Sequence, residues 1–340
     1  MIENNLFKHA QKELVIDAFL CWLFNEMNGN KDLQTLRDQF LFELLNLDSR
    51  EIGAIHGMKA ETQVDFIDLL VTLEKPEGEK YIVFENKMWS SEHSNQLERY
   101  KEKKPDALEY VYLKLGYVHK LDEEAANSAG YLIIKANQLY DLLNPFKGHH
   151  LFIGEFVEYL KSDFVDPQDN FENYVQDDEF EKLSNGSFQQ YVMGRIMDNF
   201  ENQGNIESDL EFRIGSNRGG SSWTQLKFSR KYNFYGDQHE TLFFRIDKRS
   251  GKYYFRVNQY AKGASKFWDR KKKRLDKFRD VAKKAAEKVG LNPGKLSNRG
   301  KNESEVVVFF FEENNSLNAI IKKTPYLAKE LIACHKKLHD

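Results

Sequence analysis

Polar residues interrupt two apolar runs in the first third of the sequence, and their types suit chemistry at a metal ion or a water molecule. Asp68 lies within one run that is rich in Ile, Leu and Val, and Glu85 and Lys87 end the next run. A carboxylate in an otherwise buried strand is costly unless a partner or a metal ion compensates its charge. Because successive side chains of a strand point to opposite faces, Glu85 and Lys87 share one face and Asn86 points to the other.

If the two runs form neighbouring strands, Asp68 joins Glu85 and Lys87 at one point. Two carboxylates at one point form a hard oxygen site that suits Mg²⁺ or Mn²⁺. A lysine beside them can orient or deprotonate a water molecule, or stabilise a charged transition state. The alternative is a strand-end salt bridge, in which Glu85 pairs with Lys87 or with another surface charge and has no catalytic role.

The surrounding segments predict a small sheet with helices packed around it. The apolar runs at 67–73 and 81–84 are separated by a turn that contains Pro76 and Gly78, which predicts a strand, a turn and a second strand. Further strands are expected at 110–115 and 131–134, and helices at 3–28, 33–47, 92–103, 137–143 and 152–161. Helices around a central sheet indicate an α/β or α+β domain over residues 1–165.

The second half of the chain predicts a smaller α+β domain. Residues 166–186 are acidic, contain Pro167 and predict a linker, so the second domain spans 187–340. It should contain helices at 187–203 and 317–338, a hairpin with strands at 241–247 and 252–258, and a strand at 306–311. Alternation along the hairpin places Arg245, Tyr254 and Arg256 on the face opposite to Phe244.

The basic residues are concentrated in one segment. The chain has 50 Lys and Arg against 53 Asp and Glu, a net charge of −3, but residues 262–301 hold fifteen basic and four acidic residues. That segment therefore carries +11 and the rest of the chain −14. Such a basic helix indicates nucleic-acid contact or a solvated helix face, or packing against an acidic domain or partner subunit. The candidate nucleic-acid-binding residues are Lys266, Arg270, Lys271, Lys273, Arg274 and Lys277, with Arg245 and Arg256 on the hairpin.

The composition excludes several classes of protein. Of the 340 residues, 41% are hydrophobic and 14% aromatic, which excludes wholesale disorder. Two cysteines, Cys21 and Cys334, cannot form a disulfide framework, and the start of the sequence lacks the features of a signal peptide. Because no apolar run has the length of a membrane span, we expect a cytoplasmic protein without membrane partners.

The order of these residues resembles a known family. Asp68 and the later Glu85-Asn86-Lys87 are similar to the D…(D/E)xK core of the PD-(D/E)xK nuclease superfamily, and the segment from Gln96 to Tyr100 resembles the QxxxY element of its RecB-like branch. The opening helix, with Glu13, also resembles one bacterial family of this superfamily. The resemblance covers about residues 3–160. It departs at Ile67, where the motif has proline, and Asp65 is an alternative first acid that would face the opposite side of the strand.

The resemblance implies a restriction-endonuclease-like fold, in which a central mixed β-sheet is flanked by helices. It also implies that Asp68, Glu85 and the backbone carbonyl of Asn86 hold Mg²⁺ or Mn²⁺, with Glu13 as a further ligand. Lys87 would position or activate the attacking water. Gln96 and Tyr100, four residues apart on one helix face, would orient Lys87 or contact the backbone phosphate. The ordinary alternative is that Tyr100 anchors its helix while Gln96 and Glu13 are surface groups.

The resemblance therefore implies a divalent-metal-dependent phosphodiesterase, a deoxyribonuclease-like hydrolase that cuts nucleic acid and in the first instance DNA. A homodimer is compatible with it, and a role in restriction or defence rests on analogy alone. The alternatives are a catalytically inactive nucleic-acid-binding or sensing module and a purely structural interaction protein. His335 and His339 are four residues apart and could share a zinc ion, but a terminal surface helix is the better interpretation of that segment.

Overall fold

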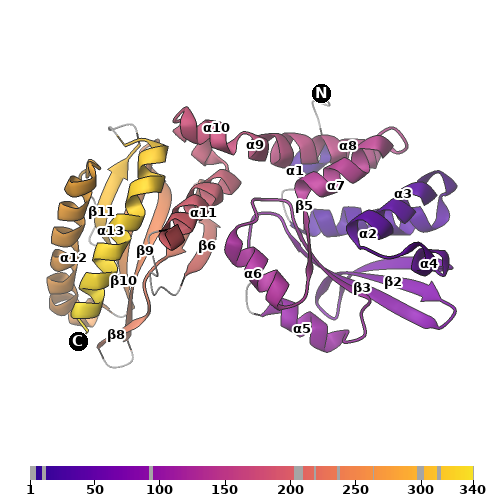
Figure 1. The fold of residues 1–340 in the computed structure, drawn as a ribbon, viewed down its shortest axis with the longest axis horizontal. Helices are drawn as coiled ribbons and strands as arrows, with labels where there is room; N and C mark the ends of the chain where they lie inside the picture. The colour runs from indigo at the N-terminus through magenta and orange to yellow at the C-terminus, as the bar shows by residue number, and fades with distance from the viewer. Residues whose placement is uncertain are drawn as a thin grey trace. The chain divides into compact units, whose positions relative to one another are not determined.

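The computed structural model divides into two units, Met1–Asp169 and Asn170–Asp340. The structure describes residues 5–9, 13–91, 95–202, 210–217, 220–235, 238–262, 264–296, 302–311 and 315–339. Each unit has a sheet and helices of its own (Figure 1). No helix in these described ranges is both long and apolar enough to cross a membrane.

The described part of the first unit is built on a mixed sheet whose strand order follows the sequence. The strands are β1 (Gly57–Val64), β2 (Ile67–Lys75), β3 (Gly78–Lys87), β4 (Glu109–Lys114) and β5 (Leu132–Lys135). Strands β1, β2 and β3 are antiparallel, whereas β3, β4 and β5 are parallel. The expected strand–turn–strand is the β2–β3 hairpin, and the predicted central mixed sheet is confirmed.

Helices pack on both faces of this sheet. On one face, α2 (Glu13–Gly29), α3 (Gln34–Gln39), α7 (Ala136–Leu143) and α8 (Leu151–Leu160) share a core with Val71 and Phe84 of the strands. On the other face, α5 (Gln96–Lys103) packs against Leu70 and Val83 through Tyr100, and α6 (Lys120–Ser128) contributes a neighbouring cluster. Shorter helical segments are α1 (Leu6–His9), η1 (Lys31–Leu33), η2 (Phe40–Leu44), α4 (Ser49–Gly53), η3 (Asn144–Phe146), η4 (Lys161–Val165) and α9 (Asp166–Asp169).

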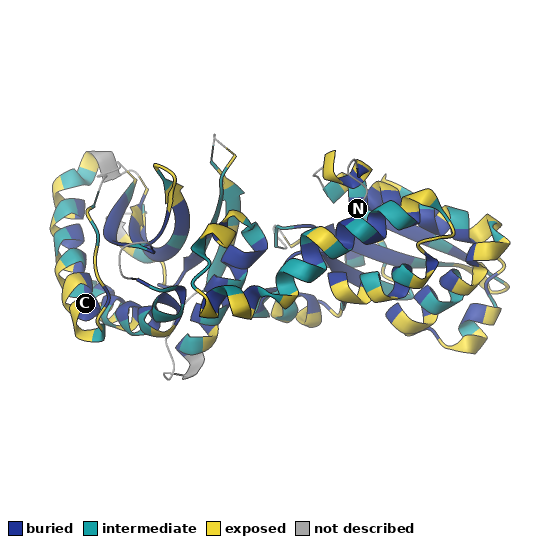
Figure 2. Ribbon diagram, turned by 90° about the horizontal axis from the view of Figure 1, so that it is seen from above, coloured by how far each residue is buried: buried dark blue, intermediate teal, exposed yellow. Residues whose placement is uncertain are grey.

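Strands β2 and β3 are buried on both faces because helices cover both. Leu70, Val71, Val83 and Phe84 are all at most 4% exposed, which is the usual situation for strands in the middle of a helix-flanked sheet. Figure 2 shows the same pattern, with buried strands inside and exposed residues on the outer sides of the helices. Polar side chains at the end of such strands therefore need a compensating partner.

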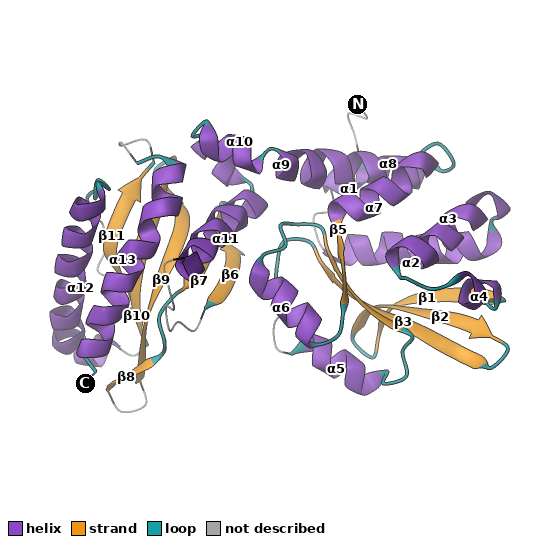
Figure 3. Ribbon diagram, in the orientation of Figure 1, coloured by secondary structure: helices purple, strands orange, loops and turns teal. Residues whose placement is uncertain are grey.

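The second unit combines an antiparallel sheet with helices. Its described strands are β6 (Glu211–Ser216), β7 (Ser222–Lys227), β8 (Tyr232–Tyr235), β9 (Gln238–Arg249), β10 (Lys252–Ala261) and β11 (Glu303–Phe310) (Figure 3). They adjoin in the order β11, β10, β9, β7 and β6, and β8 pairs with β9. The helical segments are α10 (Phe171–Gln176), η5 (Phe180–Ser184), α11 (Gly186–Asn202), η6 (Ala264–Phe267), α12 (Trp268–Val289) and α13 (Leu317–Lys337).

The hairpin of β9 and β10 has the alternation that the sequence predicts. Phe244 is fully buried and its ring lies 6.0 Å from that of Phe200 on α11, so this face of the sheet packs against helices. Arg245 pairs directly with Arg256 across the two strands, and both therefore point to the opposite face.

Two expectations about the domains need correction. The segment 166–186, expected to be a linker, instead contains α9, α10 and η5. Phe171 is 1% exposed and its ring lies 5.3 Å from the ring of Phe188, so the segment is held by packed apolar side chains. The second unit, expected to be the smaller one, is about as long as the first, because the division lies at Asp169 and Asn170.

Candidate active site

The register of β2 and β3 brings the first two predicted acids together. Leu69 pairs with Phe84 in this antiparallel ladder, so the preceding Asp68 lies beside Glu85. Asp68 Oδ2 accepts a hydrogen bond of 3.0 Å from the backbone N–H of Asn86. Asp65, the alternative first acid, lies in the turn before β2 with a left-handed φ of 53° and is not part of the strand. The structure therefore supports Asp68 as the acid that accompanies Glu85.

Glu85 and Lys87 form a buried ion pair at the end of β3. Glu85 is fully buried, Lys87 is 3% exposed, and Lys87 Nζ contacts Glu85 Oε1. Burial raises the pKa of Glu85 to about 7, with a further increase from Asp68, although Lys87 opposes both. Burial alone would lower the pKa of Lys87, but the surrounding carboxylates, led by Glu85, outweigh it and raise the pKa. Lys87 is consequently protonated at neutral pH.

Tyr100 reaches the same point from helix α5. Its hydroxyl donates a hydrogen bond of 3.4 Å to Asp68 Oδ1. Burial raises the pKa of Tyr100, and the charges of Glu85 and Asp68 raise it further, so the hydroxyl remains a donor. Gln96 begins the same helix one turn earlier and is half-buried.

Glu13 is held at the end of β3 by two hydrogen bonds. Its Oε1 accepts from Ser90 Oγ at 2.6 Å and from the backbone N–H of Met88 at 3.2 Å. Its charge also contributes to the raised pKa of Lys87. The first residue of α2 therefore lies close to the motif that comes more than seventy residues later.

Asp17 is a fourth acid at this site that the sequence did not single out. It is 2% exposed, and its Oδ1 accepts a hydrogen bond of 2.7 Å from Asn86 Nδ2. Burial raises the pKa of Asp17 to about 7, Asn86 opposes this, and Asp68 and Glu13 add to it. Its one signal in the sequence is its position one helical turn after Glu13, within an apolar segment.

A second buried lysine lies beside Lys87. Strands β3 and β4 are parallel, and Lys87 pairs in register with Lys114, which is fully buried. Lys114 contacts Asp122 of α6, and Asp122 also lies 3.2 Å from Nε2 of His119. Burial lowers the pKa of His119 to about 3, so this imidazole is neutral at ordinary pH. The sequence signal was a lysine at the end of an apolar strand, the same signal that identified Lys87.

The donor set fits a hard divalent cation. Both carboxylate oxygens of Glu85 are buried, and apart from the ion pair of Oε1 with Lys87 no described residue donates a hydrogen bond of good geometry to them. Carboxylate and carbonyl oxygens are the ligands that Mg²⁺ and Mn²⁺ prefer. Asp68, Glu85 and the backbone carbonyl of Asn86 are the groups that could hold such an ion, with Glu13 nearby.

A comparison with known protein families identifies the family of the first unit. Residues 2–166 match the model of the PD-(D/E)XK nuclease superfamily. The first unit belongs to this superfamily. Neither the curated proteins nor the solved structures gave a match to the chain. The PD-(D/E)XK unit carries its motif residues Asp68, Glu85 and Lys87 in one cluster, and Tyr100 of the expected QxxxY element reaches Asp68.

The hairpin arginines of the second unit lie in an ion-pair network rather than free in solvent. Arg256 contacts Asp247 at 3.1 Å, Glu303 at 3.2 Å and Glu305 at 3.3 Å. Arg245 lies 3.1 Å from Asp247. Both side chains are only 13% exposed, and their acidic neighbours compensate most of their charge.

The basic segment of α12 divides into buried and exposed residues. Lys266, just before the helix, and Arg270, Lys273 and Lys277 on it are exposed, as the nucleic-acid interpretation requires. The other two candidates are inside the unit. Lys271 is fully buried and donates to the backbone carbonyl of Asn302, and Arg274 is 7% exposed and donates to Glu240. Contact with a phosphate backbone is therefore incompatible with the positions of Lys271 and Arg274.

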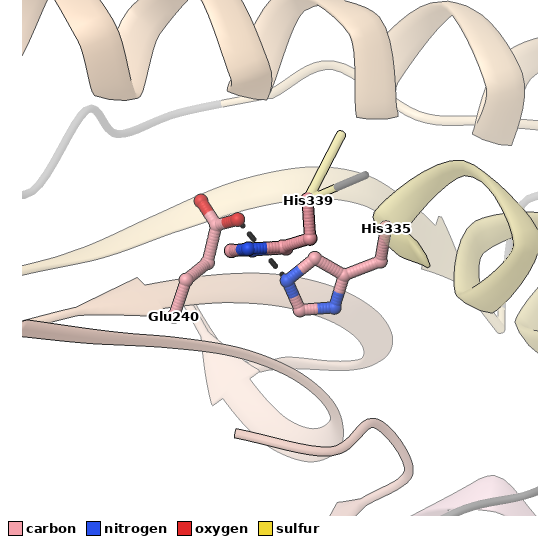
Figure 4. Close-up of side chains that lie close together, drawn as sticks. All are labelled: Glu240, His335 and His339. Atoms are coloured by element: carbon pink, nitrogen blue, oxygen red, sulfur yellow. Dashed lines mark ion pairs between the residues drawn. The ribbon is translucent and has the colours of Figure 1, made fainter. Parts of the chain in front are cut away.

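Glu240, His335 and His339 form a compact group in the second unit (Figure 4). Their potential ligand atoms all lie within 4.8 Å of one another. Arg274 is already part of this group, since its Nη2 lies 2.6 Å from Glu240 Oε2 and 2.8 Å from His339 Nε2. A guanidinium at these distances opposes the entry of a metal cation. The cluster is therefore an ion-pair network, and His335, expected on a surface helix, is instead fully buried.

Proposed function

We propose that the first unit is a divalent-metal-dependent nuclease that hydrolyses phosphodiester bonds in DNA. The observation that carries the proposal is the meeting of Asp68, Glu85 and Lys87 at the end of β3 in a unit of the PD-(D/E)XK nuclease superfamily. The choice of DNA over RNA rests on the general habit of the family, as does a role in restriction or defence. The two free cysteines, Cys21 and Cys334, fit a cytoplasmic location.

Each motif residue has a role that follows from its surroundings. A Mg²⁺ or Mn²⁺ ion held by Asp68, Glu85 and the carbonyl of Asn86 would stabilise the charge of the transition state and of the leaving oxygen. Lys87 is protonated because carboxylates surround it. It therefore orients the attacking water and donates to a phosphate oxygen, rather than removing a proton as a free amine.

The remaining residues hold this arrangement in place. Tyr100 donates to Asp68 and thereby fixes the orientation of that carboxylate. Asp17 binds the side chain of Asn86, whose backbone carbonyl is the proposed third ligand. We assign Gln96, one turn before Tyr100, a contact with Lys87 or with the backbone phosphate, as in the RecB-like branch.

The exposed basic residues near the start of α12 supply the proposed contact between the second unit and DNA. Lys266, Arg270, Lys273 and Lys277 are exposed and are the proposed phosphate contacts, and the buried Lys271 and Arg274 are no longer included. If several phosphates are neutralised, affinity should fall by orders of magnitude between about 50 and 200 mM salt. A weak salt dependence would argue for a solvated helix face.

The test is cleavage of linear, circular and single-stranded DNA, and of RNA, with Mg²⁺ or Mn²⁺. We expect Lys87→Ala and Glu85→Gln to lower the rate by at least about 100-fold, the lower end of the effect of removing one electrostatic contact to a transition state. Lys59→Ala is the matched control, because Lys59 is an exposed lysine of the same unit with a side chain 63% exposed. It should cleave like the wild type.

Two outcomes would contradict the proposal. Wild-type protein that binds DNA but cleaves none of these substrates with either metal would favour the inactive binding or sensing module. Cleavage that survives Lys87→Ala would separate the activity from the proposed site. Thermal unfolding with and without Mg²⁺ gives a reading that does not depend on cleavage, since an ion bound only to the folded state stabilises it.

A further inference from the structure

The second unit has a groove on the sheet face that points away from α11. It has a volume of about 730 Å³ and is lined by side chains of β6, β7, β9, β10 and β11, together with the residues just before β8 and just after β10. Thr241, Phe243 and Arg245 line it from β9, whereas the intervening Phe244 packs towards Phe200 of α11. The groove is therefore formed by the opposite face of the same strands.

The lining has an excess of positive charge. Five cationic side chains line the groove, against the carboxylates of Glu211 and Glu303. Glu211 is shared by two of the cations, at 2.5 Å from Arg213 and 2.9 Å from Lys227. Lys231 and Lys262 are exposed and form no ion pair with any described residue, so they are the cations available to a ligand.

Aromatic groups form part of the floor. The indole of Trp223 lies over the backbone of Gly215, where a Cβ would come within 2.4 Å of the ring. The guanidinium of Arg245 lies 4.3 Å from the centre of the same indole. Tyr260 also lines the groove and is 37% exposed. These planar groups offer stacking surfaces beside the two available lysines.

We propose that this groove binds single-stranded nucleic acid. Lys231 and Lys262 neutralise backbone phosphates, and unpaired bases stack on Tyr260 and on the Trp223–Arg245 pair. Stacking on aromatic and guanidinium planes together with a cationic groove is how proteins bind single strands, whereas the bases of a duplex are already stacked on one another. The two carboxylates of the lining, which repel phosphates, restrict backbone contact to the part of the groove near these lysines.

This binding site does not depend on catalysis by the first unit. The assay uses the full chain with Lys87→Ala and EDTA, so that no strand is cut. Fluorescence anisotropy measures binding of a labelled 12-nucleotide oligothymidylate, the same strand in a duplex, and thymidine monophosphate as competitor. If the protein binds the single strand but the nuclease proposal fails, only the groove proposal stands. If the protein cleaves DNA but the groove does not bind the single strand, only the nuclease proposal stands.

Tyr260 gives the sharpest variant. Loss of one aromatic stacking partner weakens binding by about 5-fold to more than 100-fold, so Tyr260→Ala should show at least a 5-fold rise in Kd for the single strand. Tyr260→Phe keeps the ring and should bind as the parent does. Equal binding by the Ala and Phe variants would overturn the stacking role, provided that both unfold at the temperature of the parent.

Lys231 and Lys262 allow a second test, which measures how binding depends on salt. Each phosphate contact to a single strand contributes about −0.7 to the slope of log K against log salt, so Lys231→Ala/Lys262→Ala should reduce the magnitude of that slope by about 1.4. Lys329→Ala removes an exposed lysine of α13 and serves as the control. An unchanged slope, an equal loss of duplex binding, or competition by the monophosphate as effective as that by the oligonucleotide would overturn the proposal.

Discussion

Asp17→Asn tests the electrostatics of the active site most directly. Asp17 is buried, and its pKa rises from an ordinary 3.8 to about 7 because burial disfavours the charged carboxylate. The amide of the variant has nearly the same shape and can still accept the hydrogen bond from Asn86 Nδ2. It carries no charge at any pH. The substitution should therefore stabilise the first unit wherever the wild-type carboxylate is ionised.

The sign and the size of this stabilisation follow from the pKa values of Asp17 in the unfolded and folded chains. Below pH 3.8 Asp17 is protonated in both the folded and the unfolded chain, so it does not lower the free energy of unfolding. Between 3.8 and about 7 the folded chain binds more protons than the unfolded one, so the wild type loses stability as the pH rises. Burial of this carboxylate therefore lowers the free energy of unfolding of the wild type by about 4 kcal/mol at pH 8 and by about 1.7 kcal/mol at pH 5. The advantage of Asp17→Asn should therefore shrink by about 2–3 kcal/mol between these pH values.

Unfolding would be measured at pH 5, 6.5 and 8 in EDTA, so that no divalent ion influences the carboxylates. Hydrogen exchange of β2 and β3 peptides reports on the first unit separately from the second. Asp38→Asn, with a side chain 46% exposed, is the matched control and should change stability by less than about 0.5 kcal/mol. A variant that is less stable than the wild type at pH 8, or an advantage independent of pH, would refute the reasoning.

Two further substitutions test the second unit, each by denaturant unfolding. Arg274→Ala leaves Glu240 buried without its main cation, and the unit should lose roughly 3–5 kcal/mol. Zn²⁺ should not stabilise the wild-type unit, in which Arg274 is present, and stabilisation would mean that the native cluster binds metal. Phe171→Ala should cost roughly 3–5 kcal/mol, because Phe171 is 1% exposed in the segment once expected to be a linker. Lys329→Ala, on the exposed side of α13, is the control for both.

The catalytic motif could be predicted because it depends on local geometry. A strand, a two-residue turn and a second strand fix their own register, so the spacing from Asp68 to Glu85 nearly determines that the two acids meet. The alternation of side chains then places Lys87 beside Glu85. Tyr100 follows from helical periodicity once the helix has been placed. The same local logic predicted that Arg245 and Arg256 share a face.

The missed residues depend on packing between distant elements. Asp17 meets Asn86 across 69 positions, and helical periodicity gives the buried face of α2 but not the strand residue that it faces. Lys114 lies beside Lys87 through a parallel pairing, whose register no hairpin fixes. Strand β1 was also missed, because Lys59, Glu61 and Gln63 interrupt its apolar residues at the edge of the sheet.

The basic segment illustrates a different limit. Leu275 and Phe278 recur at helical spacing along α12, and both are buried as that spacing indicates. Lys271 and Arg274 flank these apolar residues, and a charge count treats them like their exposed neighbours. They are buried because acceptors far away in sequence, the carbonyl of Asn302 and the carboxylate of Glu240, bind them. Sequence periodicity identifies an apolar face but not the distant acceptor that allows a charge to be buried.

The two buried acidic clusters differ in how their charge is compensated. Burial would raise the pKa of Glu240, but the contacts with His335 and Arg274 outweigh it and lower the pKa to about 2. In the first unit, Glu85 has Lys87 as a cation and still has a pKa of about 7. A cluster that serves stability alone has no reason to leave a buried carboxylate under-compensated, because the cost is several kcal/mol. Under-compensated carboxylates are what a site that receives a cation requires. The contrast therefore favours a structural role for the Glu240 cluster and a functional one for Glu85.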